Sequence, residues 1–290
     1  MALFRTIALA ALLCLAAPAA AQDPAVVYPP MEQRIAAAAQ ASRAASQMIA
    51  YDQAAWHATD QFLADAGSDT QSEIAARFPG AAGFVVIPTE TQGQLEVLFV
   101  ANRAEGPVAV ASYIAEGSTI LSGAIFAPGS ERPLSPLAKR MFDAHNALLA
   151  AAAENSAGLC APGTPNTLVL PPDESGVIHA YLLTPQTDPN SYPLGGHYRA
   201  TIQPDGTVSE FRALYQDCLP ITWDPEASDL PMQSFIATHS LDPQPNEIHG
   251  FVSYYVPFPM GIVTGDSIWI VIGGEIGEAV PMDAETGEIP

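Results

Sequence analysis

The stretch GFVVIPTETQGQLEVLFVANRAEGPVAVASYIAEGSTILSGAIF, residues 83–126, decides the fold class of this 290-residue chain. Its four segments rich in Val, Ile, Leu, Ala or Phe are separated by short runs that contain Gly, Glu, Pro or Asn. Apolar runs of this length, joined by short turns, are typical of antiparallel strands connected as hairpins. The stretch therefore predicts an antiparallel meander with strands over residues 83–88, 94–101, 108–115 and 119–126.

A long helix is expected before this meander, over residues 31–66. The segment contains strong helix formers and neither Pro nor Gly, and Gly67 is a plausible stop. Its large apolar side chains recur in a seven-residue register at Ile35, Ile49, Trp56 and Leu63. Between residues 36 and 45 the stripe carries only Ala and Ser, so this half is expected to pack closely while it buries little area.

A helix followed by strands is predicted a second time after residue 130. Ser135 as N-cap and Pro136 at the first helical position predict the helix start, and Gly158 predicts its end. Further strands are expected over residues 167–170, 177–184, 197–203, 208–215, 247–256, 261–264 and 267–272. The fold class is therefore α+β, with antiparallel meanders each preceded by an amphipathic helix. The segments 31–130 and 131–290 would form two similar halves or share one extended sheet.

Residues 1–21 have the features of a signal peptide. Arg5 gives a basic start, residues 6–17 form an apolar run, and Ala19–Ala21 provide small residues for cleavage. The apolar run is shorter than the ~20 residues that cross a bilayer, which disfavours a retained transmembrane anchor. We therefore expect cleavage after residue 21, a mobile lead over residues 22–30, and a mature chain that is periplasmic or secreted.

Charge and cysteine content limit the possible partners and the compartment. The formal net charge is −21 at pH 7, which disfavours nucleic acid and anionic membrane surfaces as partners. Removal of the signal peptide takes Cys14 with it and leaves Cys160 and Cys218. An even pair of cysteines in an oxidising compartment predicts a disulfide, with two buried free thiols as the alternative.

Histidines are the candidates for catalysis, because the sequence lacks the common motifs of zinc proteases, serine hydrolases and phosphate-binding loops. His179, His197 and His249 fall on predicted strands, which could bring their rings together as a three-histidine zinc site. Glu247 would then be the general base of a metal-dependent hydrolase. No spacing enforces this convergence, and otherwise each histidine serves packing or hydrogen bonding and no cofactor is expected.

Arg199 is a candidate for ligand binding. Arginine is scarce in this acidic chain, and Gly195 and Gly196 allow a ligand or another backbone segment to come close. An arginine in this position could bind a carboxylate or phosphate through two hydrogen bonds. The alternative is an internal ion pair with Glu210, on the strand connected to it by a turn at Asp205.

The aromatic segment 251–258 is a candidate for an apolar binding surface. Tyr254 and Tyr255 could line a groove if they are exposed, whereas alternating aromatic residues in strands usually belong to the core. The sequence as a whole favours an exported, non-enzymatic binding or interaction protein, whose partner is an unknown envelope component or a small molecule. The metal-dependent hydrolase is the alternative.

Overall fold

The computed structural model describes residues 28–67, 71–226 and 234–282. The predicted signal peptide, residues 1–21, lies outside these ranges. Residues 22–27 of the predicted mobile lead also lie outside them. Helices and mostly antiparallel sheets make up the described part, which confirms the α+β fold class. In these ranges no helix has both the length and the hydropathy that a membrane crossing requires.

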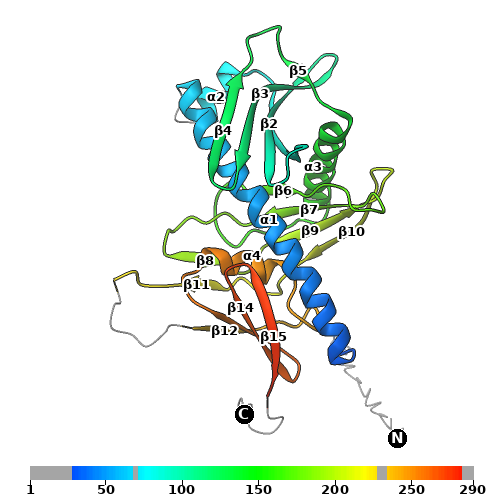
Figure 1. The fold of residues 1–290 in the computed structure, drawn as a ribbon, viewed down its shortest axis with the longest axis vertical. Coiled ribbons are helices and arrows are strands. Elements are labelled where there is room, and N and C mark those ends of the chain that lie inside the picture. Colours follow the sequence, from blue (N-terminus) through cyan, green and yellow to red (C-terminus); the bar gives the residue numbers. More distant parts are fainter. Residues whose placement is uncertain (1–27, 68–70, 227–233, 283–290) are drawn as a thin grey trace, which may run out of the picture.

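Helix α1 (Met31–Ala66) runs along most of the molecule and contacts elements from both parts of the chain (Figure 1). Its bounds match the prediction, and Gly67 ends it in the left-handed conformation, with φ of 59°. Its seven-residue stripe is not its buried face, because Ile35 and Trp56 are exposed. The buried face is rich in alanine and consists of Arg34, Ala38, Ala45, Met48, Tyr51, Ala54, Ala55, Ala58, Phe62 and Ala66.

The small residues on α1 allow a close approach of a second helix, α4 (Glu247–Tyr255). A Cβ atom on Gly250 would lie only 2.6 Å from the Cβ atom of Ala45 and 2.9 Å from the carbonyl oxygen of Gly274. A larger side chain at either helix position would force the two helices apart. The alanine-rich face of α1 is therefore the closely packed one, whereas Ile35 and Trp56 are exposed.

The N-terminal sheet is formed by the strands of the stretch at residues 81–133 and pairs them in the order β1-β2-β3-β4. Its strands are β1 (Ala81–Pro88), β2 (Gln94–Arg103), β3 (Gly106–Glu116), β4 (Thr119–Ile125) and β5 (Arg132–Pro133), which pairs with β3. Helix α2 (Gln71–Arg77) precedes it. The C-terminal half of α1 packs on this sheet, where Phe62 stacks on Phe99 with ring centroids 4.2 Å apart.

Helix α3 (Pro136–Glu154) begins as predicted, since the Ser135 side chain accepts a hydrogen bond from the backbone N–H of Ala138 at 3.2 Å. The helix ends at Glu154, four residues before the predicted stop at Gly158. It packs against β1 on one side and against the middle sheet on the other. That sheet has the order β10-β9-β7-β6, with β6 (Asn166–Val169), β7 (Ile178–Leu183), β9 (Tyr198–Ile202) and β10 (Val208–Ala213).

The predicted disulfide between Cys160 and Cys218 is present, with the two Cα atoms 5.3 Å apart. It lies beside a short two-stranded sheet of β8 (Ser191–Pro193) and β11 (Pro220–Thr222), which the sequence pattern does not predict. The bond connects the segment after α3 to the segment after β10. It thereby fixes two irregular stretches that have few backbone pairs of their own.

The C-terminal sheet has the order β12-β13-β14-β15 and contains one parallel pair, β12 with β13. Its strands are β12 (Phe235–Thr238), β13 (Met260–Thr264), β14 (Ser267–Ile272) and β15 (Glu275–Pro281). The strand predicted over residues 247–256 is wrong, because this segment is helix α4. The Asn246 side chain caps it by accepting from the Ile248 N–H at 3.2 Å, and this start signal outweighs the β-propensity of the aromatic residues that follow.

Arg34 attaches the first turns of α1 to the C-terminal sheet. Its guanidinium donates to the Thr264 carbonyl and hydroxyl oxygens, each at 2.9 Å, and to the Pro243 carbonyl at 2.8 Å. It also pairs with Asp266 at 3.1 Å and lies near the ring of Trp269. A buried arginine with this many acceptors joins segments more than 200 residues apart in the sequence.

Candidate functional site

The middle sheet has one polar face, which carries two of the candidate residues, His179 and Arg199. Strand pairing sets His179 opposite Thr201 and Tyr181 opposite Arg199. The next strand sets Glu210 opposite Thr201 and Arg212 opposite Arg199. Residues that are directly opposite or two apart in a strand share a face, so these six side chains form a compact polar block. Helix α3 covers the other, apolar face of the sheet.

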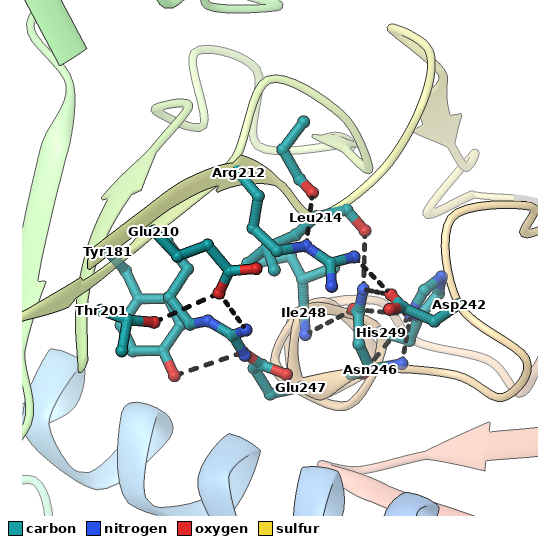
Figure 2. Close-up of polar contacts among 12 residues, drawn as sticks. Tyr181, Thr201, Glu210, Arg212, Leu214, Asp242, Asn246, Glu247, Ile248 and His249 are labelled. Atoms are coloured by element: carbon teal, nitrogen blue, oxygen red, sulfur yellow. Dashed lines mark hydrogen bonds and ion pairs between the residues drawn. The ribbon is translucent and has the colours of Figure 1, made fainter. Parts of the chain in front are cut away.

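Arg199, on the middle strand of this block, is held by two carboxylates, Glu210 and Glu247, which Figure 2 shows. Its Nη1 donates to Glu247 Oε1 at 2.7 Å, and its Nη2 donates to Glu210 Oε2 at 3.2 Å. The hydroxyl of Tyr181 also donates to Glu247 Oε1, at 3.4 Å. The predicted internal ion pair with Glu210 is confirmed, and the second partner, from the first turn of α4, is one that strand spacing could not reveal.

Asp242 forms a second polar centre next to the first. It accepts hydrogen bonds from Arg212 at 2.7 Å and from Asn246 at 2.9 Å, and its Oδ2 lies 3.0 Å from His239 Nε2. Burial alone would raise the pKa of Asp242, but the hydrogen bonds from His239, Arg212 and Asn246 hold it well below its ordinary value. The carboxylate is therefore charged at neutral pH, and its Oδ2 has three partners from its own chain.

The two centres meet at the first turn of α4, where Asn246 and Glu247 are consecutive. Asn246 caps the helix and donates to Asp242 and to the Leu214 carbonyl, and Glu247 binds Arg199. We call this set the α4 cluster; it consists of Tyr181, Arg199, Thr201, Glu210, Arg212, His239, Asp242, Asn246, Glu247 and His249. It attaches α4 to the polar face of the middle sheet through charged hydrogen bonds.

Two histidines are completely buried here: His249, which belongs to the α4 cluster, and His197, which does not. The ring of His197 accepts at Nδ1 from the Thr184 N–H at 3.1 Å, and its Nε2 lies 2.9 Å from the Pro193 carbonyl oxygen. These two contacts are satisfied by the neutral ring with its proton on Nε2. Burial lowers the pKa of His197 to about 4, and the bond to Pro193 opposes only part of the shift. Burial and the neighbouring His239 also lower the pKa of His249.

The three histidines of the predicted zinc site come from different surroundings. His179 lies on β7, His197 directly precedes β9, and His249 lies on α4 rather than on a strand. Both ring nitrogens of His197 are already bonded to protein atoms. Across residues 28–67, 71–226 and 234–282, no group of three or more His, Cys, Asp and Glu side chains could hold a metal ion. The three-histidine hypothesis therefore has no support in this part of the chain.

The structure instead brings His249 next to His239, with ring centroids 4.6 Å apart. His239, Asp242 and Asn246 have no role in the sequence-based prediction. A sequence signal did exist, since Asn246 followed by Glu247 is typical of a helix start with an acidic first turn. The pairing of Asp242 with Arg212 depends on the path of the loop between β12 and α4, which leaves no local pattern.

Gly195 and Gly196 allow a close approach of the chain itself. A Cβ atom on Gly195 would lie 1.8 Å from the Asp217 carbonyl oxygen, and one on Gly196 would lie 2.6 Å from the Cys160 amide nitrogen. Gly196 also has a φ of +72°, which favours glycine. The two glycines therefore accommodate the backbone at both ends of the disulfide and, at Gly196, the Thr184 hydroxyl, which a Cβ atom would approach to 2.5 Å.

The two candidate tyrosines have different environments. Tyr254 is exposed on α4, and Tyr255 is partly buried between α4 and α1. The hydroxyl of Tyr255 donates to Asp52 and accepts from Gln53 Nε2, and its ring stacks on Tyr192. Burial raises the pKa of Asp52, even though the hydrogen bond from Tyr255 opposes the shift. Tyr255 is thus a contact between helices, and only Tyr254 faces solvent.

No protein-family model, curated protein or solved structure matches this chain. Its function therefore has to follow from the residues and contacts above.

Proposed function

We propose that this chain is an exported, non-enzymatic binding protein of the cell envelope. The predicted signal peptide over residues 1–21 would take it to an oxidising compartment, periplasmic or extracellular. The disulfide between Cys160 and Cys218 supports this destination, because such bonds persist in oxidising surroundings. The partner is an envelope component or a small molecule.

The engagement of the α4 cluster by its own chain supports a non-enzymatic role. A general base must present a free lone pair to its substrate. Glu247 is 5 % exposed, and its Oε1 already accepts from Arg199 and Tyr181. Asp242 is bonded by Arg212, His239 and Asn246 in the same way. One oxygen of each carboxylate, Glu247 Oε1 or Asp242 Oδ2, is thus occupied by partners from the chain itself, which suits a role in stabilising the structure.

Elemental analysis tests this proposal against the metal-dependent hydrolase. The mature chain from Gln22 would be produced through an oxidising route and measured for zinc, iron and manganese. We expect the folded, disulfide-bonded protein to contain no metal above background and to gain no thermal stability from added zinc. About one metal ion per chain, lost in a His197→Ala/His249→Ala variant, would overturn the proposal in favour of a hydrolase with Glu247 as base.

Of the two kinds of partner, a small molecule is supported by a groove at the N-terminal sheet. Its volume is about 830 Å³, within the range of ligand pockets in proteins. Phe78, Ile125 and Phe126 belong to its apolar lining. Its charged lining residues are Asp65, Arg77, Arg103 and Glu131, and Arg103 pairs with Glu131 at 3.3 Å. A ligand there would be apolar with a polar end, because the lining carries two basic and two acidic residues. Thermal melting with a panel of aromatic and aliphatic alcohols and acids would detect such a ligand as a concentration-dependent rise in melting temperature.

A further inference from the structure

The outer face of the C-terminal sheet carries exposed isoleucines that no described residue covers. Ile236 on β12 is 62 % exposed, and Ile270 and Ile272 on β14 are 41 % and 53 % exposed. Pairing sets Ile236 opposite Gly261 and Gly261 opposite Ile270, so these positions form one row across three strands. Ile272 is two residues further along β14 and therefore lies on the same face.

Gly261, in the middle of the row, has no side chain. A Cβ atom there would lie 2.8 Å from the Cδ1 atom of Ile268 and 3.3 Å from the Cγ1 atom of Ile236. The side chains of Ile236 and Ile268 thus pack over the backbone of Gly261. We call this surface the isoleucine face; its exposed side chains are Ile236, Ile270 and Ile272, and Gly261 and Ile268 are buried next to them.

The opposite face of the same sheet is also apolar. Met260, Ile262, Trp269 and Val271 are completely buried there. Helix α4 packs on this side. An antiparallel sheet with one face in water normally alternates apolar and polar residues, whereas a sheet that is apolar on both faces is normally covered on both. Scattered apolar residues need no explanation, but a contiguous apolar surface of this kind marks an interaction site.

The charge around this face determines which partner fits it. The chain contains no Lys or Arg after Arg212. Glu275 lies directly opposite Ile272 in the sheet, and Glu278 is exposed on the same strand, β15. A second copy of this chain would bring the same acidic border to the contact, and the two borders would repel each other. A basic partner would be attracted to the acidic border.

We propose that the isoleucine face is a docking surface for a basic, amphipathic segment of a partner protein. The apolar side of the segment covers Ile236, Ile270 and Ile272, and its Lys or Arg side chains meet Glu275 and Glu278 at the border. This proposal rests on the proposed function, because it states the chemistry of the partner.

The test uses the mature, disulfide-bonded chain and a fluorescent synthetic helix with Leu on one side and Lys on the other. Fluorescence anisotropy would measure its binding, and a peptide with Glu in place of Lys is the control. We expect Ile236→Thr/Ile270→Thr/Ile272→Thr to weaken binding of the basic peptide by roughly a hundredfold, since three apolar contacts are lost. Leu121→Thr on β4, where the leucine is 49 % exposed, should leave binding unchanged.

Three results would overturn the docking surface. The first is equal binding to the triple variant and the wild type, which would mean attraction to the acidic surface in general. The second is absence of binding to the wild type. The third is a wild-type dimer that the triple substitution dissociates in sedimentation velocity, which would identify a second copy as the occupant. Thermal melting of both variants verifies folding. None of these results affects the measurement of bound metal that tests the proposed function. The docking surface can therefore be refuted while the proposed function stands.

Discussion

The N-terminal sheet and the α4 cluster are stabilised by different kinds of interaction. In the N-terminal sheet, consecutive strands pair in chain order and bury aromatic and aliphatic side chains such as Phe62 and Phe99. In the α4 cluster, charged partners such as Arg199 and Glu247 meet across 48 residues of sequence. Apolar contacts tolerate many partners, whereas each charged group depends on one geometry. The N-terminal sheet should therefore tolerate small changes of side chain, and its strands can be predicted from the sequence. The α4 cluster should tolerate such changes poorly, and most of its contacts cannot be predicted.

Truncation of the aromatic core should have the largest effect. Phe62 is buried and packs against Phe78, Phe99 and Tyr113. Phe62→Ala is expected to lower the free energy of unfolding by about 4 kcal/mol, because it removes apolar area and leaves a cavity. Urea denaturation followed by circular dichroism would measure this. Phe62→Leu is the matched control and should cost about 1 kcal/mol, since it keeps most of the apolar volume. Equal losses for both variants would contradict the tolerance ascribed to this core.

Removal of the buried arginine should have the next largest effect. Arg34→Met keeps the length of the side chain but leaves the Thr264 and Pro243 carbonyl groups without their donor. We expect a loss of about 3 kcal/mol in the free energy of unfolding. Lys139→Met removes an exposed pair with Asp143 and should cost no more than about 0.5 kcal/mol in the same urea titration. A similar loss in the two variants would show that burial does not determine how much a charged side chain contributes to the free energy of unfolding.

Elements with a local sequence signal can be predicted at nearly their observed positions. Ser135 and Pro136 start α3 through contacts within its first turn, and Gly67 ends α1 in the conformation that favours glycine. Alternation and short turns likewise predict β1 to β4. The strands β8 and β11 escape prediction because three residues are too few for a pattern, and β12 escapes it because it lies in a segment rich in Pro and acidic residues. Helix α4 is buried on nearly every side, so it has no polar stripe to reveal its period.

The site is less predictable than the fold for the same physical reason. The pairing of Arg199 with Glu210 follows from strands joined by one turn, and it can be predicted. The pairing of Arg34 with Asp266 or of Arg212 with Asp242 depends on how distant segments meet. The buried face of α1 shows that apolar residues can also mislead a prediction. Ala45 is buried where the helix packs closely, whereas the larger Trp56 is exposed.

Acid should weaken the region around α4 before it weakens the N-terminal sheet. The pKa of His197 is about 4 in the folded chain, against about 6.5 when unfolded. The unfolded chain therefore binds the proton first, so this contribution to stability is complete above pH 6.5 and is lost as the pH falls toward 4. Between pH 7 and 5 the loss from His197 alone should be about 2 kcal/mol.

His197→Asn, which retains an acceptor for the Thr184 amide, should remove this part of the pH dependence. Urea denaturation of both proteins at pH 7 and pH 5 measures the difference, and other titrating groups cancel in the comparison. Hydrogen exchange at pH 5 should locate the faster-opening amides around β8 and α4. An identical pH dependence in the two proteins would mean that His197 does not titrate with a lowered pKa.

The smallest expected effect concerns the ion pair that joins α4 to the middle sheet. A double-mutant cycle with Arg199→Met and Glu247→Gln should give a coupling energy of about 1.5 kcal/mol, because Glu247 is buried and the pair is held at 2.7 Å. The same cycle on Lys139 and Asp143, an exposed pair within one helix, should give about 0.3 kcal/mol. Because a cycle subtracts the effect of each single change, it separates the pair from the packing of its side chains. Equal coupling in the two pairs would mean that α4 is held by its apolar contacts with α1, and the two regions of the molecule would then differ only in how well their sequences predict them.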